Sequence, residues 1–429
     1  MIDLLYQKYI ETNRTICTDT RHIESGSLFF ALKGESFDGN KFASDALSKG
    51  AKYAVIDNPS FQTENTILVD DTLKALQNLA HTYRKKQQFK VLALTGTNGK
   101  TTTKELIHQV LKTQYRCHAT AGNFNNHIGV PLTILSASPD SELLIVEMGA
   151  NHVGEIKTLC EIADPDMGLI TNIGKAHLDG FGGYEGVIKA KSELYTYLIR
   201  KDGTIFYNAT DSLLDSLLTN YKNKLAYGNA ESGYFAQQTV FNNGITVDLE
   251  IENSTHTLDT KLFGNYNVTN ILVAARIGRF FNIKLKKIAT AICNYEPTNN
   301  RSQIMNTDRK NTLIIDSYNA NPSSMKAAIE SFNQIKAQNK VSILGGMKEL
   351  GDAEGIEHSN LLELVRETNC RKIILIGKEF ENCRLKSNEE HYTETENLIY
   401  ILKKSPITKS LILIKGSRSN KLETIVSSL

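Results

Sequence analysis

The chain has 429 residues, which at about 150 residues per domain predicts two or three domains. Its 49 lysine and arginine residues nearly balance 47 aspartate and glutamate residues, which argues against a protein built mainly to hold nucleic acid or an anionic membrane. No apolar stretch approaches the roughly 18 residues of a transmembrane helix, and the start lacks the pattern of a secretory signal. We therefore expect a cytoplasmic protein with no membrane span and no nucleic-acid partner.

The six cysteines are dispersed and include no Cys-x-x-Cys pair, so a zinc cluster or a dithiol site is not expected. Isolated cysteines in a chain without a secretory signal are most often small core residues.

Strand-like and helix-like segments alternate along the chain, which predicts an α/β protein. In the first block, residues 27–32 and 51–57 are typical of strands, and residues 40–49 form a short helical pattern that stops at a glycine. A longer amphipathic helix is predicted over residues 71–86. It ends in a polar run at residues 84–88, where we place the first domain boundary.

The second block extends over residues 89–297. It opens with a strand at residues 90–94, and residues 143–147 and 167–171 have the short apolar runs of buried parallel strands. Alternating side chains at residues 244–251 predict an antiparallel edge strand.

The third block, residues 298–429, is predicted to be a small doubly wound domain, in which ligands bind beyond the carboxyl ends of the strands. Pro322 lies near the start of its first helix. Its expected strands are residues 312–316, 341–344, 372–376 and 411–414.

The most informative motif is the glycine-rich segment 95–103, TGTNGKTTT, between the strand at 90–94 and a helical pattern. Gly96 and Gly99 allow the backbone N–H groups to face phosphate oxygens, Lys100 can reach the β- and γ-phosphates, and the Thr101 hydroxyl can hold Mg²⁺. The motif departs from the usual phosphate loop because a leucine occupies the position of the first glycine. We interpret it as a nucleotide-binding loop rather than a ligand-free turn.

Three further residues are less informative alone. Glu147 ends a buried strand and is either a second Mg²⁺ ligand or a helix-capping or surface acid. His177 follows a strand and a glycine, where a structural histidine is the commoner case. Lys191 lies in a helical pattern, where a solvated lysine is expected.

Further polar and glycine-rich segments accompany the phosphate loop along the chain. They are DTR at 19–21, FDG at 37–39, GNFNNHIGVP at 122–131, EMGANHVGE at 147–155, NIGKAHLDGFG at 172–182, GNYNVTN at 264–270, NRSQ at 300–303, DSYNANP at 316–322, GMKELG at 346–351 and KGSRS at 415–419. Together with the phosphate loop, these segments resemble the Mur ligase family from the first block to the last.

The resemblance implies three domains: a UDP-sugar-binding domain at 1–88, a central P-loop ATPase domain with a parallel sheet at 89–297, and a Rossmann-like domain at 298–429 that binds a dipeptide and closes on the nucleotide. Within the family, the DSYNANP and KGSRS segments are most similar to the members that add D-alanyl-D-alanine. The implied substrates are ATP with Mg²⁺, UDP-MurNAc-tripeptide and D-Ala-D-Ala. The implied reaction is ADP-forming amide ligation through an acyl phosphate, completing UDP-MurNAc-pentapeptide for peptidoglycan, by an enzyme expected to be a monomer.

The resemblance also implies roles for individual residues. The implied catalytic residues are Lys100, Glu147, His177, Lys191 and Arg301. The implied nucleotide-binding residues are Gly96, Thr97, Asn98, Gly99, Lys100, Thr101, Thr102, Asn267, Asn270, Arg301, Asp316 and Asn319. The implied substrate-binding residues are Thr20, Arg21, Asp38, Gly39, Asn123, Asn126, Lys415, Ser417 and Arg418. The implied metal ligands are Thr101, Glu147, His177 and Lys191.

Lys191 matches the lysine that the family carbamylates with CO₂, and a carbamate would offer anionic oxygens where an ammonium would repel Mg²⁺. Because Arg301 and Asp316 lie beyond the second boundary, the last domain is expected to close to complete the site. Two positions depart from the family pattern: Tyr266 and Asn40 stand where relatives often have histidine.

Two alternatives remain open from the sequence. One is a ligase of the same family that adds a different amino acid, such as a third-residue-adding or folylpolyglutamate synthase-like enzyme. The other is an ATP-binding switch without ligase chemistry. The third residue of the acceptor, diaminopimelate or lysine, is also open.

Overall fold

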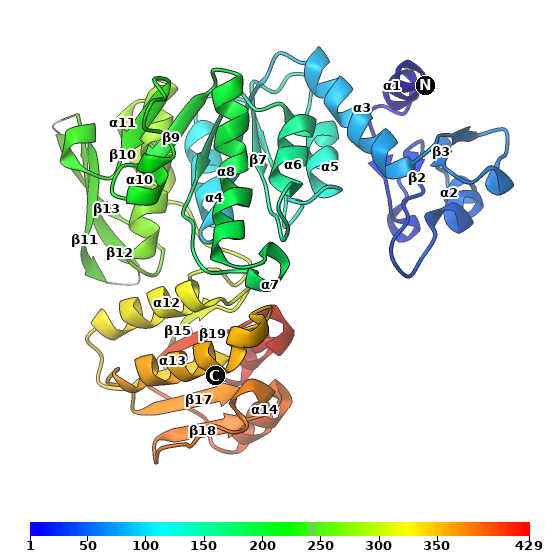
Figure 1. Cartoon of the computed structure of the whole chain (residues 1–429). Helices are drawn as coiled ribbons and strands as arrows, with labels where there is room; N and C mark the ends of the chain where they lie inside the picture. The colour runs from blue at the N-terminus through cyan, green and yellow to red at the C-terminus, as the bar shows by residue number, and fades with distance from the viewer. Residues whose placement is uncertain (242–243, 253) are drawn as a thin grey trace.

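The computed structural model describes residues 1–241, 244–252 and 254–429. Three units follow one another along the chain, each built around a sheet that is wholly or mainly parallel (Figure 1). The expected α/β class is confirmed. Within these residues, no helix is long and apolar enough to cross a membrane.

The first unit is a four-stranded parallel sheet in the order β1-β2-β3-β4. Its strands are β1 (Ile16–Cys17), β2 (Leu28–Phe30), β3 (Tyr53–Ile56) and β4 (Thr66–Leu68), and its helices are α1 (Ile2–Glu11) and α2 (Ala43–Ser48). The strands predicted at 27–32 and 51–57 are confirmed. The first turn of the helix predicted at 40–49 is a 3₁₀ turn, Gly39–Phe42, capped by the Asp38 carboxylate.

Helix α3 (Thr72–Lys86) joins the first unit to the central one. The Asp71 carboxylate caps its start by accepting from the Lys74 N–H at 2.8 Å. Near its end, the Tyr83 hydroxyl donates to the Ala137 carbonyl at 2.6 Å, and Arg84 pairs with Asp166 at 2.8 Å. The helix therefore ties the first unit firmly to the core of the second.

The central unit contains a six-stranded parallel sheet in the order β10-β9-β8-β5-β7-β6. Its strands are β5 (Lys90–Thr95), β6 (Cys117–Ala119), β7 (Leu143–Glu147), β8 (Met167–Ile170), β9 (Thr204–Asn208) and β10 (Lys224–Tyr227). Its helices are α4 (Lys100–Leu111), α5 (Gly129–Ser136), α6 (Glu155–Ala163), α7 (Leu178–Phe181), α8 (Tyr184–Arg200), α9 (Ser212–Ser216), α10 (Tyr266–Phe280) and α11 (Leu285–Cys293).

Helices cover both faces of this sheet. Side chains of α3, α5, α6 and α8 pack in the core on one face, and those of α4, α10 and α11 pack in the core on the other. Burial on both faces explains why β8, and β7 up to its last residue Glu147, are apolar rather than alternating. The strands predicted at 90–94, 143–147 and 167–171 are confirmed.

The segment predicted as an antiparallel edge strand, residues 244–251, contains β12 (Ile245–Ile251), and the edge assignment is wrong. β12 is the middle strand of a three-stranded antiparallel sheet, paired with β11 (Tyr234–Phe241) on one side and β13 (Ser254–Asp259) on the other. Its alternation has another cause: one face packs on the core while the other is partly exposed.

The third unit is a six-stranded sheet in the order β14-β15-β19-β16-β17-β18, with only β14 antiparallel. Its strands are β14 (Gln303–Asn306), β15 (Thr312–Asp316), β16 (Lys340–Gly345), β17 (Lys372–Ile376), β18 (Glu389–Tyr392) and β19 (Leu411–Lys415), and its helices are α12 (Pro322–Gln334), α13 (Glu354–Arg366) and α14 (Thr395–Lys404). The four predicted strands and the helix that begins at Pro322 are confirmed.

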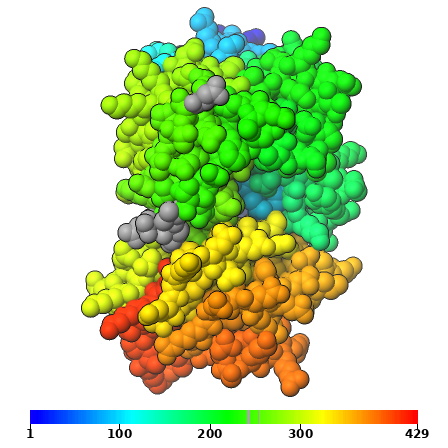
Figure 2. Space-filling view, turned by 90° about the vertical axis from the view of Figure 1, so that its left-hand side faces the viewer, coloured from blue at the N-terminus to red at the C-terminus, as the bar shows by residue number. Residues whose placement is uncertain are grey.

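The third unit lies directly against the central one, and their boundary crosses the face of the molecule shown in Figure 2. The start of α12 faces this boundary (Figure 1). The carboxyl end of the central sheet faces the same boundary, since β5 leads directly into the phosphate loop there.

Candidate active site

The segment Gly96–Gly99 forms a tight loop between β5 and α4. Gly96 has φ +143°, and a Cβ there would lie 2.0 Å from the Thr171 hydroxyl oxygen. Gly99 has φ +78°, and a Cβ there would lie 2.9 Å from Asn270 Oδ1. Only glycine meets both the backbone and the space requirements at these two positions. Leu94, at the place of the usual first glycine, is a fully buried residue of β5.

Lys100 begins helix α4, and its ammonium donates to the Gly96 and Thr97 carbonyls of its own loop at 2.7 and 3.0 Å. Burial lowers the pKa of Lys100 to about 8, although the Glu147 carboxylate opposes this effect. The loop thus holds a cation at a helix N-terminus, an arrangement that favours phosphate.

A cavity of about 840 Å³ opens beside this loop and is lined by the central and third units. Most of the residues predicted from the sequence line it: Gly96, Thr97, Asn98, Gly99, Lys100, Thr101, Thr102, Asn123, Asn126, Glu147, His177, Lys191, Asn267, Asn270, Arg301, Asp316, Asn319 and Lys415. Thr20, Arg21, Asp38, Gly39, Ser417 and Arg418 do not line it.

Glu147, at the end of β7, is almost completely buried, with 2% of its surface exposed. Its Oε1 accepts from Asn125 Nδ2 at 2.8 Å and from the Thr101 hydroxyl at 3.3 Å. Its Oε2 is also buried, and no group of the described residues donates a hydrogen bond to it. A buried carboxylate with one oxygen left over is suited to a cation.

Lys191, in helix α8, is buried rather than solvated, with 3% of its surface exposed. Its ammonium lies 5.3 Å from the centre of the Phe181 ring and makes a long contact of 3.4 Å with the Ala150 carbonyl. Burial lowers the pKa of Lys191 to about 7, and the charge of Lys100 adds to this effect. A large fraction of the amine is therefore neutral near pH 7.

His177 lies at the start of α7 with a left-handed backbone, φ 51°. Its Nδ1 contacts the Glu349 carboxylate, which belongs to the third unit. Burial lowers the pKa of the His177 imidazole below its ordinary value, the Glu349 carboxylate opposes this, and Lys100 and Lys191 reinforce it.

Arg301 lies on the connection between the central and third units. Its guanidinium carbon stands 3.6 Å from the centre of the Tyr318 ring, and that of Arg418 stands 5.4 Å from the same ring. Three residues of this connection, Asn299, Asn300 and Ser302, have left-handed φ values of 59°, 56° and 49°. Such a run is costly for residues other than glycine and marks an unusual bend beside the cavity.

Asp316 ends β15 next to Lys415, which ends the neighbouring parallel strand β19. Lys415 Nζ donates to Asp316 Oδ2 at 2.6 Å, and the Ser302 N–H donates to Asp316 Oδ1 at 3.2 Å. Both predicted residues thus reach the cavity, but they are paired with each other. Ser417, two residues further along, is buried away from the cavity.

Two asparagines of α10 connect this helix to α4, the helix that follows the phosphate loop. Asn270 Nδ2 donates to Asn267 Oδ1 at 2.8 Å, and Asn270 Oδ1 accepts from the Thr103 hydroxyl at 3.0 Å. The Tyr266 hydroxyl, where relatives often have histidine, lies 3.0 Å from Ser302 Oγ. Burial and the nearby Asp316 raise the pKa of Tyr266 well above its usual range, so its hydroxyl stays neutral.

The predicted residues of the first unit lie apart from the cavity and take part in local structure. Asn40, the second departure from the family pattern, is completely buried, and its Nδ2 donates to Asp38 and Asp57 at 2.7 and 2.8 Å. Arg21 is largely exposed and pairs with Asp19 at 2.6 Å. A Cβ at Gly39 would lie 2.2 Å from the Leu32 carbonyl oxygen.

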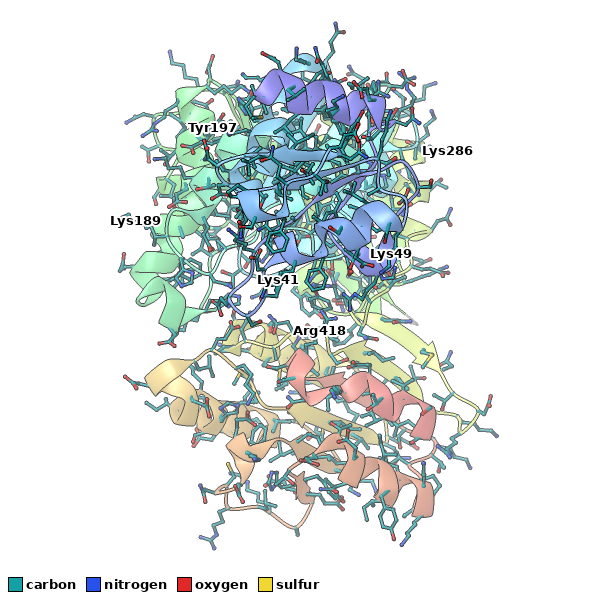
Figure 3. All side chains as sticks on the ribbon, turned by 90° about the vertical axis from the view of Figure 1, so that its right-hand side faces the viewer. Lys41, Lys49, Lys189, Tyr197, Lys286 and Arg418 are labelled. Atoms are coloured by element: carbon teal, nitrogen blue, oxygen red, sulfur yellow. The ribbon has the colours of Figure 1, made fainter. Side chains whose placement is uncertain are left out.

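Three basic residues labelled in Figure 3 lie on the neighbouring sides of the first and third units. Lys41 and Lys49 lie along the side of the first unit nearest the third, and Arg418 lies at the facing edge of the third (Figure 3).

Several cavity residues were missed by the sequence reasoning. Asn125 donates to Glu147, whereas the neighbouring Asn126, predicted to bind substrate, accepts from the N–H of Gly129, the first residue of α5, at 2.8 Å. The asparagine-rich segment 123–126, which follows β6, is the sequence feature that could have indicated a role for Asn125. Tyr318 and Asn321 also line the cavity, and the DSYNANP motif contains both without indicating a role for either. Glu349, in the GMKELG motif, lies outside the cavity lining and reaches the site only through His177.

Three family models match the chain in succession. The model described as "Mur ligase family, catalytic domain" matches residues 14–84, "Mur ligase middle domain" matches 94–278, and "Mur ligase, glutamate ligase domain" matches 300–418. The chain belongs to the Mur ligase family. The residues that line the cavity come from the segments matched by the second and third of these models in chain order, 94–278 and 300–418.

Individual Mur ligases match over nearly the whole length. A UDP-N-acetylmuramoyl-tripeptide--D-alanyl-D-alanine ligase of Bacillus subtilis is 37% identical over 96% of this chain and 92% of its own. A crystal structure of MurF from Acinetobacter baumannii is 30% identical, with a TM-score of 0.88 over 97% of this chain and 93% of its own. The MurF ligase of Thermotoga maritima, solved with ADP, has the same fold, with 24% identity, a TM-score of 0.88 and 97% coverage of both chains.

Proposed function

We propose that this chain is the ATP-dependent ligase that joins D-alanyl-D-alanine to UDP-N-acetylmuramoyl-tripeptide, the step that completes the peptidoglycan precursor UDP-MurNAc-pentapeptide. The observation that carries the proposal is the shared cavity: a phosphate loop and a buried carboxylate from the central unit face Arg301 and the start of α12. The Bacillus subtilis relative, 37% identical over nearly the full length, carries the name of this activity.

The chemistry requires activation of a carboxylate, because hydroxide is a poor leaving group for amide formation in water. Transfer of the γ-phosphoryl group of ATP to the peptide carboxylate gives an acyl phosphate and ADP. The amine of D-Ala-D-Ala then attacks the acyl carbon, and the tetrahedral intermediate expels phosphate. Catalysis of such transfers is mainly positioning and electrostatic stabilisation.

The cavity offers cations at the positions this reaction needs. Lys100 and the loop N–H groups would hold the β- and γ-phosphates, and Arg301 would neutralise charge on the transferring group from the opposite side. The contact of Arg301 with the Tyr318 ring supports this role, since it fixes the guanidinium plane in the cavity.

Mg²⁺ is the metal that the family implies, and the donors present are compatible with it. Within the described ranges no three His, Cys, Asp or Glu side chains gather as a metal cluster, so the protein would supply few ligands and nucleotide phosphates the rest, as Mg²⁺ prefers. The free Oε2 of Glu147 and the nearby Thr101 hydroxyl are the best candidates. The bound ion would neutralise charge on the phosphates.

Carbamylation of Lys191 is part of the proposal. The reaction with CO₂ needs a neutral amine, and the lowered pKa of Lys191 provides one near neutral pH. The carbamate would replace a buried cation by an anion near Lys100, which relieves the repulsion between the two ammonium groups. His177, which also lines the cavity, is the remaining residue of the predicted metal set.

The three units would divide the work, with boundaries near residues 88 and 298. The first would bind the UDP-sugar part of the acceptor through Thr20, Arg21, Asp38 and Gly39, and the third would bind D-Ala-D-Ala through Lys415, Ser417 and Arg418. The rigid attachment of α3 supports a first unit fixed to the centre. The bend at Asn299–Ser302 supports a third unit that closes by rotation there.

The proposed function is tested by phosphate release from ATP and Mg²⁺ in the presence of UDP-MurNAc-tripeptide, with and without D-Ala-D-Ala. We expect sustained release only when both substrates are present. Release that is independent of the acceptor would instead favour an ATP-binding switch.

A further inference from the structure

The contact between His177 and Glu349 joins two units that are distant in sequence. His177 belongs to the central unit and lines the cavity, whereas Glu349 belongs to the loop after β16 in the third unit, 172 residues away. Both residues have left-handed backbones, with φ values of 51° and 61°. Each unit therefore bends sharply at the point where it presents its side chain to the other.

The loop that carries Glu349 is held firmly by its own unit. The Met347 N–H donates to His358 Nε2 at 2.9 Å, and the Gly346 carbonyl accepts from Asn420 Nδ2 at 3.0 Å. These bonds come from α13 and from the segment after β19, on two sides of the loop. The carboxylate is thus placed by the fold of the third unit and moves with that unit.

The chemistry of imidazole gives this contact a consequence. A neutral imidazole carries one N–H, and the partner of one ring nitrogen decides which nitrogen holds the proton. A carboxylate only accepts, so Glu349 selects the form of His177 that has its proton on Nδ1 and its lone pair on Nε2. Carboxylates behind ligating histidines commonly act in this way.

Resting on the proposed function, we propose that Glu349 is a positioning residue of the ligase: it fixes the tautomer and the ring orientation of His177, and it does so only while the third unit is docked. The lone pair on Nε2 is then free to coordinate a cation beside the transferring phosphoryl group. It could equally accept a hydrogen bond from water bound to such a cation. Docking of the dipeptide-binding unit and preparation of His177 become one event.

The same interface supplies a matched control. Lys175, two residues before His177, pairs with Glu357 of the third unit at 3.5 Å. This pair also crosses the boundary between the units, but neither residue lines the cavity. A partly exposed ion pair of this kind contributes little to the association of the two units. If Glu349 merely helped to hold the units together, Glu349 and Glu357 would be equivalent.

The first experiment reads the tautomer directly by NMR of protein labelled with ¹⁵N-histidine, with and without ADP, using His177→Gln to assign the signal. We expect the Nδ1–H form in the wild type and in Glu357→Ala, and its loss in Glu349→Ala. Glu349→Gln, which keeps an acceptor oxygen, should restore part of it. A His177 tautomer that is the same in the wild type and in Glu349→Ala under both conditions would overturn the proposal.

The second experiment compares the kinetics of the same variants. Removal of a residue behind a ligating histidine typically costs about 10–100-fold in activity. We expect a loss of that size in kcat for Glu349→Ala, with KM for ATP nearly unchanged, and a change of less than about twofold for Glu357→Ala. Equal losses in both variants would overturn the positioning role. The NMR result does not depend on which amine is ligated, so failure of this inference is distinguishable from failure of the proposed function.

Discussion

Asn98 and Asn321 lie 223 residues apart in the sequence, and Asn321 Nδ2 donates to Asn98 Oδ1 at 2.8 Å. Asn98 belongs to the phosphate loop, and Asn321 caps helix α12 of the third unit. Asn98 Nδ2 in turn donates to the Ser323 hydroxyl at 2.9 Å. The loop expected to hold the nucleotide is thus itself a docking surface for the unit expected to hold the dipeptide.

Replacing Asn98 by Ala should weaken this docking. Two partly buried hydrogen bonds contribute about 1 kcal/mol each, so the docked form should lose about tenfold or more in population. The measurement is the docked fraction, from fluorescence energy transfer between labels on the central and third units, with ADP and Mg²⁺ present. The control is the variant that already lacks both partners, Asn321→Ala with Ser323→Ala. In that background Asn98→Ala should change the docked fraction much less, and an unchanged effect of Asn98→Ala would contradict the contact.

Replacing Lys191 by Ala should depress turnover by about 100-fold or more, the scale expected when a group that stabilises transferring charge is removed. Short carboxylates such as acetate should restore part of the activity by supplying an anion at the same place. Lys189→Ala is the matched control, because Lys189 lies on the same helix and points outward to solvent (Figure 3). Full activity of Lys191→Ala without added carboxylate would rule out the carbamate.

The carbamate should also depend on pH in a definite direction. The pKa of Lys191 is lowered to about 7, so the reactive neutral amine is abundant above pH 7 and scarce below it. With ¹³CO₂, a carbamate resonance should be strong at pH 8 and weak at pH 6, and absent from Lys191→Ala. A resonance of equal intensity in that variant would assign the signal to another amine.

Tyr318 should matter through its ring rather than its hydroxyl, because Arg301 stacks on the ring at 3.6 Å. A cation–π contact of about 1 kcal/mol corresponds to a loss of about fivefold in kcat/KM for Tyr318→Ala. Tyr318→Phe keeps the ring and should retain nearly full activity. An equal loss in both variants would show that the hydroxyl is what matters.

Asp164 should anchor the first unit in a pH-dependent way. Burial by itself raises the pKa of Asp164, but hydrogen bonds from Lys201, Lys85 and Tyr197 outweigh it and hold the pKa well below its usual range. The stabilisation is therefore present above about pH 4, the unfolded value, and is lost as the pH falls further.

Asp164→Asn is a suitable variant, because asparagine also tolerates the left-handed backbone at this position, φ 44°. We expect a loss of about 2 kcal/mol in the free energy of unfolding at pH 7, since Lys85 is half exposed and the pair is only partly buried. Denaturation curves of the wild type and the variant should converge as the pH falls below 4. Curves that stay equally far apart would point to a cause other than the charge.

The strands that lead to the site could be predicted because burial on both faces leaves a simple mark in the sequence. The run at 143–147 is apolar up to Glu147, so the position of this carboxylate at a strand end followed from the pattern alone. The strand at 244–251 shows the limit of such patterns. Alternation of apolar and polar side chains indicates which face of a strand is buried. Whether the strand pairs on one side or on both depends on other segments of the chain, here β11 and β13.

Residues whose environment is created by distant parts of the chain could not be predicted from the sequence. Lys191 has the spacing of a solvated helix lysine, and its burial arises only when Phe181 and Ala150 pack around it. The resemblance to a family, not its local pattern, singled it out. Glu349 and Tyr318 lie within motifs of the family, but nothing in their local sequence indicates these contacts, because their partners, His177 and Arg301, lie in other parts of the chain.

The most direct test of the proposed function offers the enzyme a choice of amines. UDP-MurNAc-tripeptide, ATP and Mg²⁺ are incubated with equal amounts of D-Ala-D-Ala, glutamate, lysine and diaminopimelate, and the products are identified by mass spectrometry. We expect a single new product, larger than the acceptor by one D-Ala-D-Ala less one water, with one ADP formed for each amide bond. Incorporation of another amine, or ADP formation without an amide, would contradict the assignment.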